Sequence, residues 1–211
     1  MGVIASFGLF SQLYGYKRPI MRTFLIILGL LMMSVYSSEA QIREKGNFEL
    51  MPTIGITGSD FITEDIEGLD DYDARGGVQV GLLVDYYFND RWSLRSGLSY
   101  FPMGVETKGL DYLNIPFNAN WHFGKTRRWN INFGLTPGFL VSGNEYDLLK
   151  DFQLALSYGI GHKFRLSEKV SLMLDYQALL GLTDIVEDKF QYEFRRSNYG
   201  SSLNIGAVIV L

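Results

Sequence analysis

Apolar and polar residues alternate with a period of two along most of the chain after residue 41. The segment Val78–Tyr100, VQVGLLVDYYFNDRWSLRSGLSY, shows the pattern on both sides of the tripeptide Asn89-Asp90-Arg91. Such alternation is typical of β-strands with two different faces, and a short polar interruption is typical of a tight turn. The segment therefore predicts a β-hairpin.

The same alternation predicts eight strands, and no useful length of helical periodicity occurs after residue 41. The expected strands span residues 46–58, 76–88, 92–101, 110–123, 129–142, 152–165, 170–182 and 198–211. Short connections alternate with longer ones at residues 59–75, 102–109, 143–151 and 183–197. An antiparallel up-and-down meander has this rhythm, and eight such strands close into a barrel. We therefore expect an all-β fold.

The two phases of the strands favour a membrane barrel over a soluble one. In residues 129–142 one phase is apolar and aromatic, whereas the other carries Asn130, Asn132 and Thr136. Small uncharged residues suit a crowded polar interior, and an apolar phase almost free of charge suits lipid. A soluble lipocalin-type barrel would instead carry Lys and Glu on its outer phase. We expect an eight-stranded transmembrane β-barrel in contact with the lipid of the bacterial outer membrane.

Aromatic residues of the outward phase lie beside the short turns. They are Phe88, Trp92, Phe123, Trp129 and Phe164. Transmembrane barrels carry aromatic girdles at the membrane–water interfaces, so we expect these five residues to form one. The alternative is a soluble β-sandwich with these residues in its core, but a sandwich would not place all five beside the same set of turns.

The amino-terminal part of the chain has the features of an export signal. The segment MRTFLIILGLLMMSVYSSEAQ begins at Met21 with one Arg, an apolar run and small residues around a Glu. The apolar run is about half of the roughly 20 residues needed to span a bilayer, and the pattern is typical of a cleaved signal peptide. We expect residues 1–40 to be a start extension and signal peptide, and residues 41–211 to be the barrel domain. Either Met1 or Met21 is the true start, and a buried or interfacial helix is the alternative.

Composition and the two histidines argue against an enzyme, a metal site and a cofactor site. The chain has 211 residues, no Cys and a net charge of −4. The lack of Cys excludes disulfides and thiol chemistry, and the charge gives no indication of nucleic-acid binding. His122 belongs to the inward phase and His162 to the outward phase, so a shared metal is not expected. A surface hydrolase would need an outward His beside a Ser on a neighbouring strand, which His162 lacks.

Three segments resemble a known family. DYLNIPFNANWHFG, residues 111–124, resembles the Tyr-Leu-x-Ile-Pro segment of the outer-membrane β-barrel family common in Bacteroidota, the PorT-like group. The Gly-rich hairpins GLLVDYYFNDRWSLRSGLSY and ALSYGIGHKFRLSEKVSLMLDY fit the same family. The resemblance covers about residues 46–211 and implies an outer-membrane barrel; most members have no assigned activity, and one branch is linked to a protein secretion apparatus. The chain departs from outer-membrane barrels in ending on Leu211 rather than an aromatic residue, which bears on assembly rather than fold.

Two of the longer connections have distinctive compositions. Residues 59–75, SDFITEDIEGLDDYDAR, hold seven acidic residues. Clustered carboxylates bind calcium in some proteins, but the spacing is not that of an EF-hand, so we expect a solvated loop. Residues 183–197 carry Phe190, Tyr192 and Phe194. Exposed aromatic residues anchor partners in many interfaces; the alternative, which we favour, is a hairpin that extends the barrel above the membrane.

Two prolines predict a defect in the barrel wall. Pro116 and Pro137 lie in the middle of expected strands, where each removes a hydrogen-bond donor. If the turn at residues 124–128 is centred on Thr126, Pro116 lies opposite Thr136 and Pro137 opposite Ile115. We expect a bulge or missing hydrogen bonds in this seam, in the half of the barrel nearer the loops.

Charged residues of the inward phase predict a closed lumen. If the turn at residues 89–91 is centred on Asp90, Asp85 lies directly opposite Arg95, close enough to interact. Glu49 and Asp175 fall in the inward phase at a similar depth, and in so narrow a barrel both lie within reach of Arg95. We expect a network centred on Arg95 with Asp85 as its nearest partner; the alternative is an Arg95 that extends to the rim.

These inferences together predict the role of the protein. The barrel is expected to have a lumen filled by side chains. It would then act as a structural or interaction component that binds an envelope protein partner through its extracellular loops. A small-solute channel is the alternative, and eight-stranded barrels are normally filled by side chains.

Overall fold

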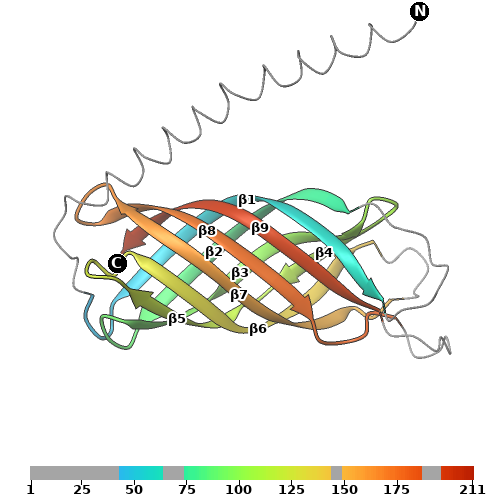
Figure 1. Cartoon of the computed structure of the whole chain (residues 1–211), viewed down its shortest axis with the longest axis horizontal. Helices are drawn as coiled ribbons and strands as arrows, with labels where there is room; N and C mark the ends of the chain where they lie inside the picture. The colour runs from blue at the N-terminus through green and yellow to red at the C-terminus, as the bar shows by residue number, and fades with distance from the viewer. Residues whose placement is uncertain (1–42, 64–73, 144–148, 187–195) are drawn as a thin grey trace, which may run out of the picture. The chain divides into compact units, whose positions relative to one another are not determined.

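The computed structural model describes residues 43–63, 74–143, 149–186 and 196–211. Its strands are β1 (Phe48–Thr63), β2 (Arg75–Tyr87), β3 (Trp92–Val105), β4 (Lys108–Asn114), β5 (Phe117–Phe123), β6 (Trp129–Ser142), β7 (Phe152–Arg165), β8 (Val170–Gly181) and β9 (Arg196–Val210). Strands that are consecutive around the wall pair antiparallel, and β1 pairs with both β2 and β9, which closes the barrel (Figure 1). Because β4 and β5 are two halves of one strand, the predicted eight-stranded up-and-down barrel is confirmed.

The barrel has a turn end and a loop end. The turn end, on the left in Figure 1, holds the short connections at residues 88–91, 124–128 and 166–169 and the carboxyl terminus. The barrel belongs to the compact unit Ala40–Leu211.

The expected signal peptide lies outside the described residues. No helix among the described residues is long and apolar enough to cross a membrane.

One expected loop is a tight turn. The sequence predicted a longer connection at residues 102–109, but β3 continues to Val105 and β4 begins at Lys108. Pro102 and Gly104 are typical of a loop, which is why the prediction was wrong. Gly104 has a φ of 91°, a conformation that glycine adopts easily, so β3 bends there and continues. Val105 is 1% exposed, so the apolar side chain at the end of β3 packs inside the barrel.

The predicted proline defect is present. β4 ends at Asn114 and β5 begins at Phe117, and β3 pairs with both strands but not with the residues between them. The N–H of Ile115 donates a hydrogen bond of 2.9 Å to the carbonyl oxygen of Pro137. Pro137 has no N–H, so it donates no second hydrogen bond to Ile115. Pro116 likewise has no N–H to donate to β3. The prediction of an interrupted ladder in this seam is therefore confirmed.

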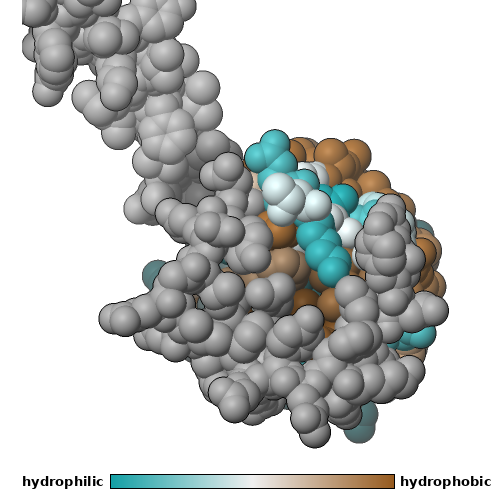
Figure 2. Space-filling view, turned by 90° about the vertical axis from the view of Figure 1, so that its right-hand side faces the viewer, coloured by the Kyte–Doolittle hydropathy of each residue, from teal (hydrophilic) through white to brown (hydrophobic). Residues whose placement is uncertain are grey.

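The two faces of the wall differ as the alternation predicted. The outward phase is apolar and solvent-accessible: Ile56, Val78, Phe133 and Leu203 are each about half exposed or more. Figure 2, which looks onto the loop end, shows apolar residues in brown along the visible side of the barrel. The inward phase is buried and mostly polar, because every second side chain of a strand points into the lumen.

Aromatic rings form a band around the turn end. The contacts join Phe48 to Tyr86, Tyr86 to Phe88, Trp92 to Trp121, Trp121 to Phe123, Phe123 to Trp129, Trp129 to His162, and His162 to Phe164. All five residues expected in the girdle belong to this band. The alternation also places Trp121 and His162 in the outward phase, although neither was among the five residues expected in the girdle.

Candidate functional site: the lumen

A charged network crosses the lumen in the turn half of the barrel. Asp85 on β2 lies opposite Arg95 on β3. Arg95 Nε is 2.9 Å from Asp85 Oδ1, and Arg95 Nη1 is 3.2 Å from Oδ1 of Asp175 on β8. All three side chains are at most 2% exposed. Arg95 therefore joins neighbouring strands on one side of the barrel to β8 on the other.

A second cation completes this network. Lys163 on β7 extends to Glu49 on β1, with Nζ 2.5 Å from Oε2, and to Asp85, with Nζ 3.2 Å from Oδ2. The hydroxyl of Tyr87 donates a hydrogen bond of 2.9 Å to Glu49 and lies 3.0 Å from the Lys163 ammonium. Arg43, just before β1, pairs with the other oxygen of Glu49. We call Arg43, Glu49, Asp85, Tyr87, Arg95, Lys163 and Asp175 the lumen network.

The position of Glu49 differs from the expectation. The sequence predicted Glu49 within reach of Arg95, but Glu49 pairs with Arg43 and Lys163 instead. Lys163 belongs to the inward phase, so alternation places it in the lumen, although it was not among the residues expected in the network. Arg43 precedes the first strand, where no periodic pattern indicates its direction.

Neutral groups surround the Arg95 guanidinium. Asn120 donates a hydrogen bond of 3.1 Å to Asp85, and Gln177 donates one of 2.7 Å to Asp175. The thioethers of Met51 and Met173 lie 4.0 and 3.9 Å from Arg95 Nη2. Buried ions need both paired charges and additional hydrogen bonds, and this site supplies both.

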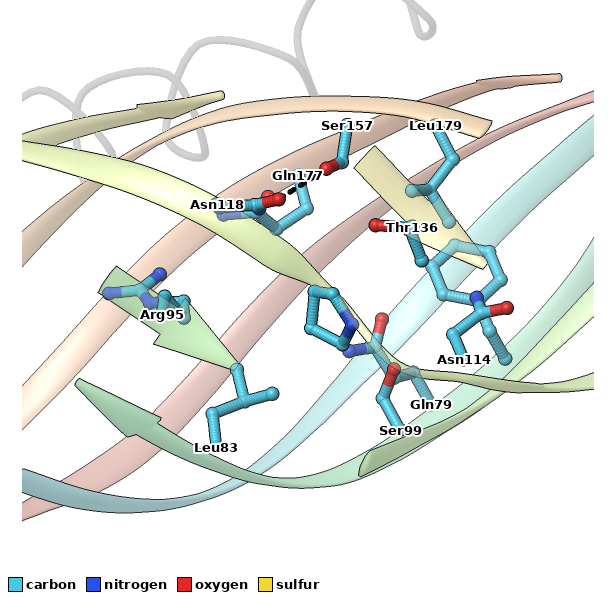
Figure 3. Close-up of a pocket in the computed structure, with 12 residues that line it drawn as sticks. Gln79, Leu83, Arg95, Ser99, Asn114, Asn118, Thr136, Ser157, Gln177 and Leu179 are labelled. Carbon is cyan, nitrogen blue, oxygen red and sulfur yellow. Dashed lines mark hydrogen bonds between the residues drawn. The ribbon is translucent and has the colours of Figure 1, made fainter. Parts of the chain in front are cut away.

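A small cavity, lined by both polar and apolar side chains, lies between the network and the loop end. Its volume is about 40 Å³, and Arg95, Asn114, Asn118 and Thr136 are among its lining residues (Figure 3). Ser157 donates a hydrogen bond of 2.6 Å to Asn118, drawn as the dashed line. Both amide atoms of Asn114 and the hydroxyl of Thr136 have no hydrogen-bond partner among the described residues. A space of this size accommodates roughly three water molecules.

Apolar side chains fill the lumen at the loop end. The buried cluster consists of Phe101, Met103, Leu110, Tyr112, Leu149, Ala155, Leu179 and Ile185. Two of these residues come from the long connections, and the N–H of Lys150 donates a hydrogen bond of 2.8 Å to the carbonyl oxygen of Ile185. The lumen is therefore filled by charged groups in its turn half and by apolar groups at its loop end.

Comparison with known proteins identifies the family. The model of the outer membrane protein beta-barrel domain family matches residues 39–187. The chain belongs to this family. The chain is thus an outer-membrane barrel, as its lipid-facing phase predicted, and the predicted location in the bacterial outer membrane is confirmed.

Solved structures share the fold of this outer-membrane barrel. AlkL, determined in lipid bilayers, has a TM-score of 0.51 and 11% identity over 83% of this chain and 95% of its own. Neisserial surface protein A has a TM-score of 0.51 and 12% identity over 77% of this chain and 96% of its own. At these identities the likeness shows the fold alone. A comparison with curated proteins found no match.

The two histidines and the loop residues of this outer-membrane barrel do not belong to the lumen network. His122 is fully buried in the lumen, with Nε2 2.9 Å from the Ser93 hydroxyl, whereas His162 lies between the rings of Trp129 and Phe164. Among the described residues, no group of three or more His, Cys, Asp or Glu side chains is placed to hold a metal ion. The loop aromatics Phe190, Tyr192 and Phe194 and most of the acidic segment 59–75 lie outside the described residues.

Proposed function

We propose that this outer-membrane barrel is a structural or interaction component of the cell envelope, with no enzymatic activity and with a lumen closed to solutes. The observation that carries this proposal is the pair of contacts that cross the lumen, Arg95 to Asp175 and Lys163 to Asp85. The apolar cluster blocks the loop end independently. If the barrel is closed at two levels, it acts mainly through contacts that its loops make with other molecules.

The loops are the proposed contact surface for an envelope protein. The resemblance to the PorT-like group makes a component of a secretion apparatus one such partner. The test is an affinity pull-down from outer membranes with the intact barrel and with barrels lacking residues 64–73 or 187–195, deletions that leave every strand intact. A partner captured by the intact barrel and lost with one deletion supports the proposal. Equal capture by all three barrels contradicts a role of these loops.

Conductance tests the closed lumen. The purified barrel in a planar bilayer is expected to show no stable ion current, because the paired charges and the apolar cluster occupy the lumen at two levels. Stable unitary currents would overturn this proposal. A barrel in which Arg95 and Lys163 are both replaced by Ser provides a comparison, since it opens space only in the turn half.

The second candidate function is a small-solute channel. The observation that favours it is the cavity between the network and the loop end, where the unpaired amide of Asn114 and hydroxyl of Thr136 are of the kind that contact water or a solute. Swelling of liposomes containing the barrel in isotonic urea or glycerol distinguishes the two functions. Swelling above that of empty liposomes supports the channel, and equal rates support the closed barrel.

A further inference from the structure

Arg128 is a buried cation at the turn end of the barrel. It lies between β5 and β6 and is 8% exposed. The N–H of Lys163 donates a hydrogen bond of 3.0 Å to its carbonyl oxygen, so Arg128 continues the pairing of β6 with β7. Since Trp129 faces outward, alternation directs the Arg128 side chain toward the lumen mouth. Arg128 Nη2 is buried and has no hydrogen-bond partner among the described residues.

The neighbouring charges do not neutralise Arg128. Each other cation of the lumen has a carboxylate partner: Arg43 has Glu49, Lys163 has Glu49 and Asp85, and Arg95 has Asp85 and Asp175. Three cations thus meet three carboxylates. Arg128 takes part in none of the ion pairs found in the described part of the chain.

The surroundings of Arg128 are unfavourable for a cation. Burial and the nearby guanidinium groups of Arg165 and Arg43 lower the pKa of Arg128. An arginine does not lose its proton in a protein, so its charge remains. A buried charge without a partner is costly, and a bound anion removes that cost. An oxyanion fits best, because a guanidinium group donates two parallel hydrogen bonds to it.

We propose that the mouth of the barrel at its turn end binds an oxyanion of the phosphate type through the Arg128 guanidinium, beside the positive charges of Arg165 and Arg43. The aromatic band places this mouth at the level of lipid headgroups. The phosphate group comes either from solution or from an anionic lipid headgroup, and the chemistry of recognition is the same. The site is independent of whether the lumen conducts.

Titration with inorganic phosphate tests the site. The barrel is purified in a non-ionic maltoside detergent, which contains no phosphate, and binding is measured by calorimetry. Arg128→Gln is expected to weaken binding roughly tenfold or more, the effect of losing a charged hydrogen bond. The matched control is Lys125→Gln, which removes an exposed charge from the same turn and is expected to leave the affinity unchanged.

Folding is measured alongside binding by the heat-modifiable gel shift. Arg128→Gln is expected to retain the shift, because it removes an unpaired buried charge. If that variant fails to fold, Arg128→Lys preserves the charge; it is expected to bind phosphate several-fold more weakly, because an ammonium group does not form two parallel bonds. Equal affinity of Arg128→Lys and the native barrel would overturn the proposal.

A second arm separates the two sources of phosphate. The heat stability of the barrel is compared in the same maltoside micelles with no addition, with inorganic phosphate and with phosphatidylglycerol. Stabilisation of the native barrel but not of Arg128→Gln by inorganic phosphate supports a free anion as ligand. The same difference with phosphatidylglycerol alone supports a lipid headgroup. A native barrel that responds to neither, or an Arg128→Gln barrel that responds as the native one does, would overturn the site.

Discussion

The guanidinium of Arg95 and the carboxylate of Asp85 form a two-point contact inside the barrel, with Nε 2.9 Å from Oδ1 and Nη2 3.3 Å from Oδ2. Neither side chain is more than 1% exposed. Planar two-point pairing is the strongest geometry for these groups. Because the pair is buried, removal of Arg95 leaves Asp175 as a buried carboxylate that has lost its cation, and leaves Asp85 with Lys163.

The first prediction concerns this pair. Arg95→Met is expected to lower the free energy of unfolding by roughly 3–5 kcal/mol, since Asp85 and Asp175 lose their shared cation. Urea-induced unfolding in lipid vesicles measures it. The control is Arg127→Met, which breaks a partly exposed pair with Asp90 and is expected to cost about 0–1 kcal/mol. Equal losses for the two variants would contradict a dry, paired site.

The second prediction concerns the hydroxyl of Tyr87. Tyr87→Phe removes one hydrogen bond to Glu49 and one from Lys163, and is expected to cost about 1–3 kcal/mol of unfolding free energy. The neighbouring residue Tyr86 provides the matched control, because its side chain faces outward and contacts Phe48 and Phe88. If Tyr86→Phe proves as costly as Tyr87→Phe, the lumen contact is not the cause.

The sequence was sufficient to predict the wall of the barrel and the contacts between neighbouring strands. A period of two fixes which side chains share a face, and the centre of a tight turn fixes the register of its hairpin. These two rules place Asp85 opposite Arg95 and locate the defect at Pro116 and Pro137. The same alternation also places Trp121 in the aromatic band, although Trp121 was not among the residues expected there.

The same two rules do not predict contacts across the lumen. Whether Glu49 pairs with Arg95 or with Lys163 depends on the tilt and stagger of strands on opposite sides of the barrel. Alternation within one strand carries no information on either quantity. Arg43 lies before the first strand, so no pattern gives its direction. The turn after Val105 was missed because Pro102 and Gly104 are typical of loops.

The third prediction concerns Gly97 on β3, beside the interrupted ladder. Its φ is 140°, and a Cβ there would lie 2.2 Å from the carbonyl oxygen of Leu82 on β2. Gly97→Ala is expected to cost at least about 1–3 kcal/mol, the usual range for strained backbone. Gly58→Ala on β1 is the control, since no atom lies within 4 Å of its Cβ position, and its effect is expected within about 0.5 kcal/mol. Urea unfolding with similar midpoints for the two variants would refute the strain.

The last prediction concerns the depth of the aromatic band. All three Trp residues of the protein, Trp92, Trp121 and Trp129, belong to it, so intrinsic fluorescence reports on the band. Lipids brominated near the headgroup are expected to quench this fluorescence more strongly than lipids brominated near the end of the acyl chain, because girdles lie at the interface. As a control, Leu156→Trp in a background with the three native Trp residues replaced by Phe places the fluorophore in the middle of β7, and the order of quenching is expected to reverse. Stronger quenching of the native barrel by the deep bromine would show that the band lies within the hydrocarbon and is not a girdle.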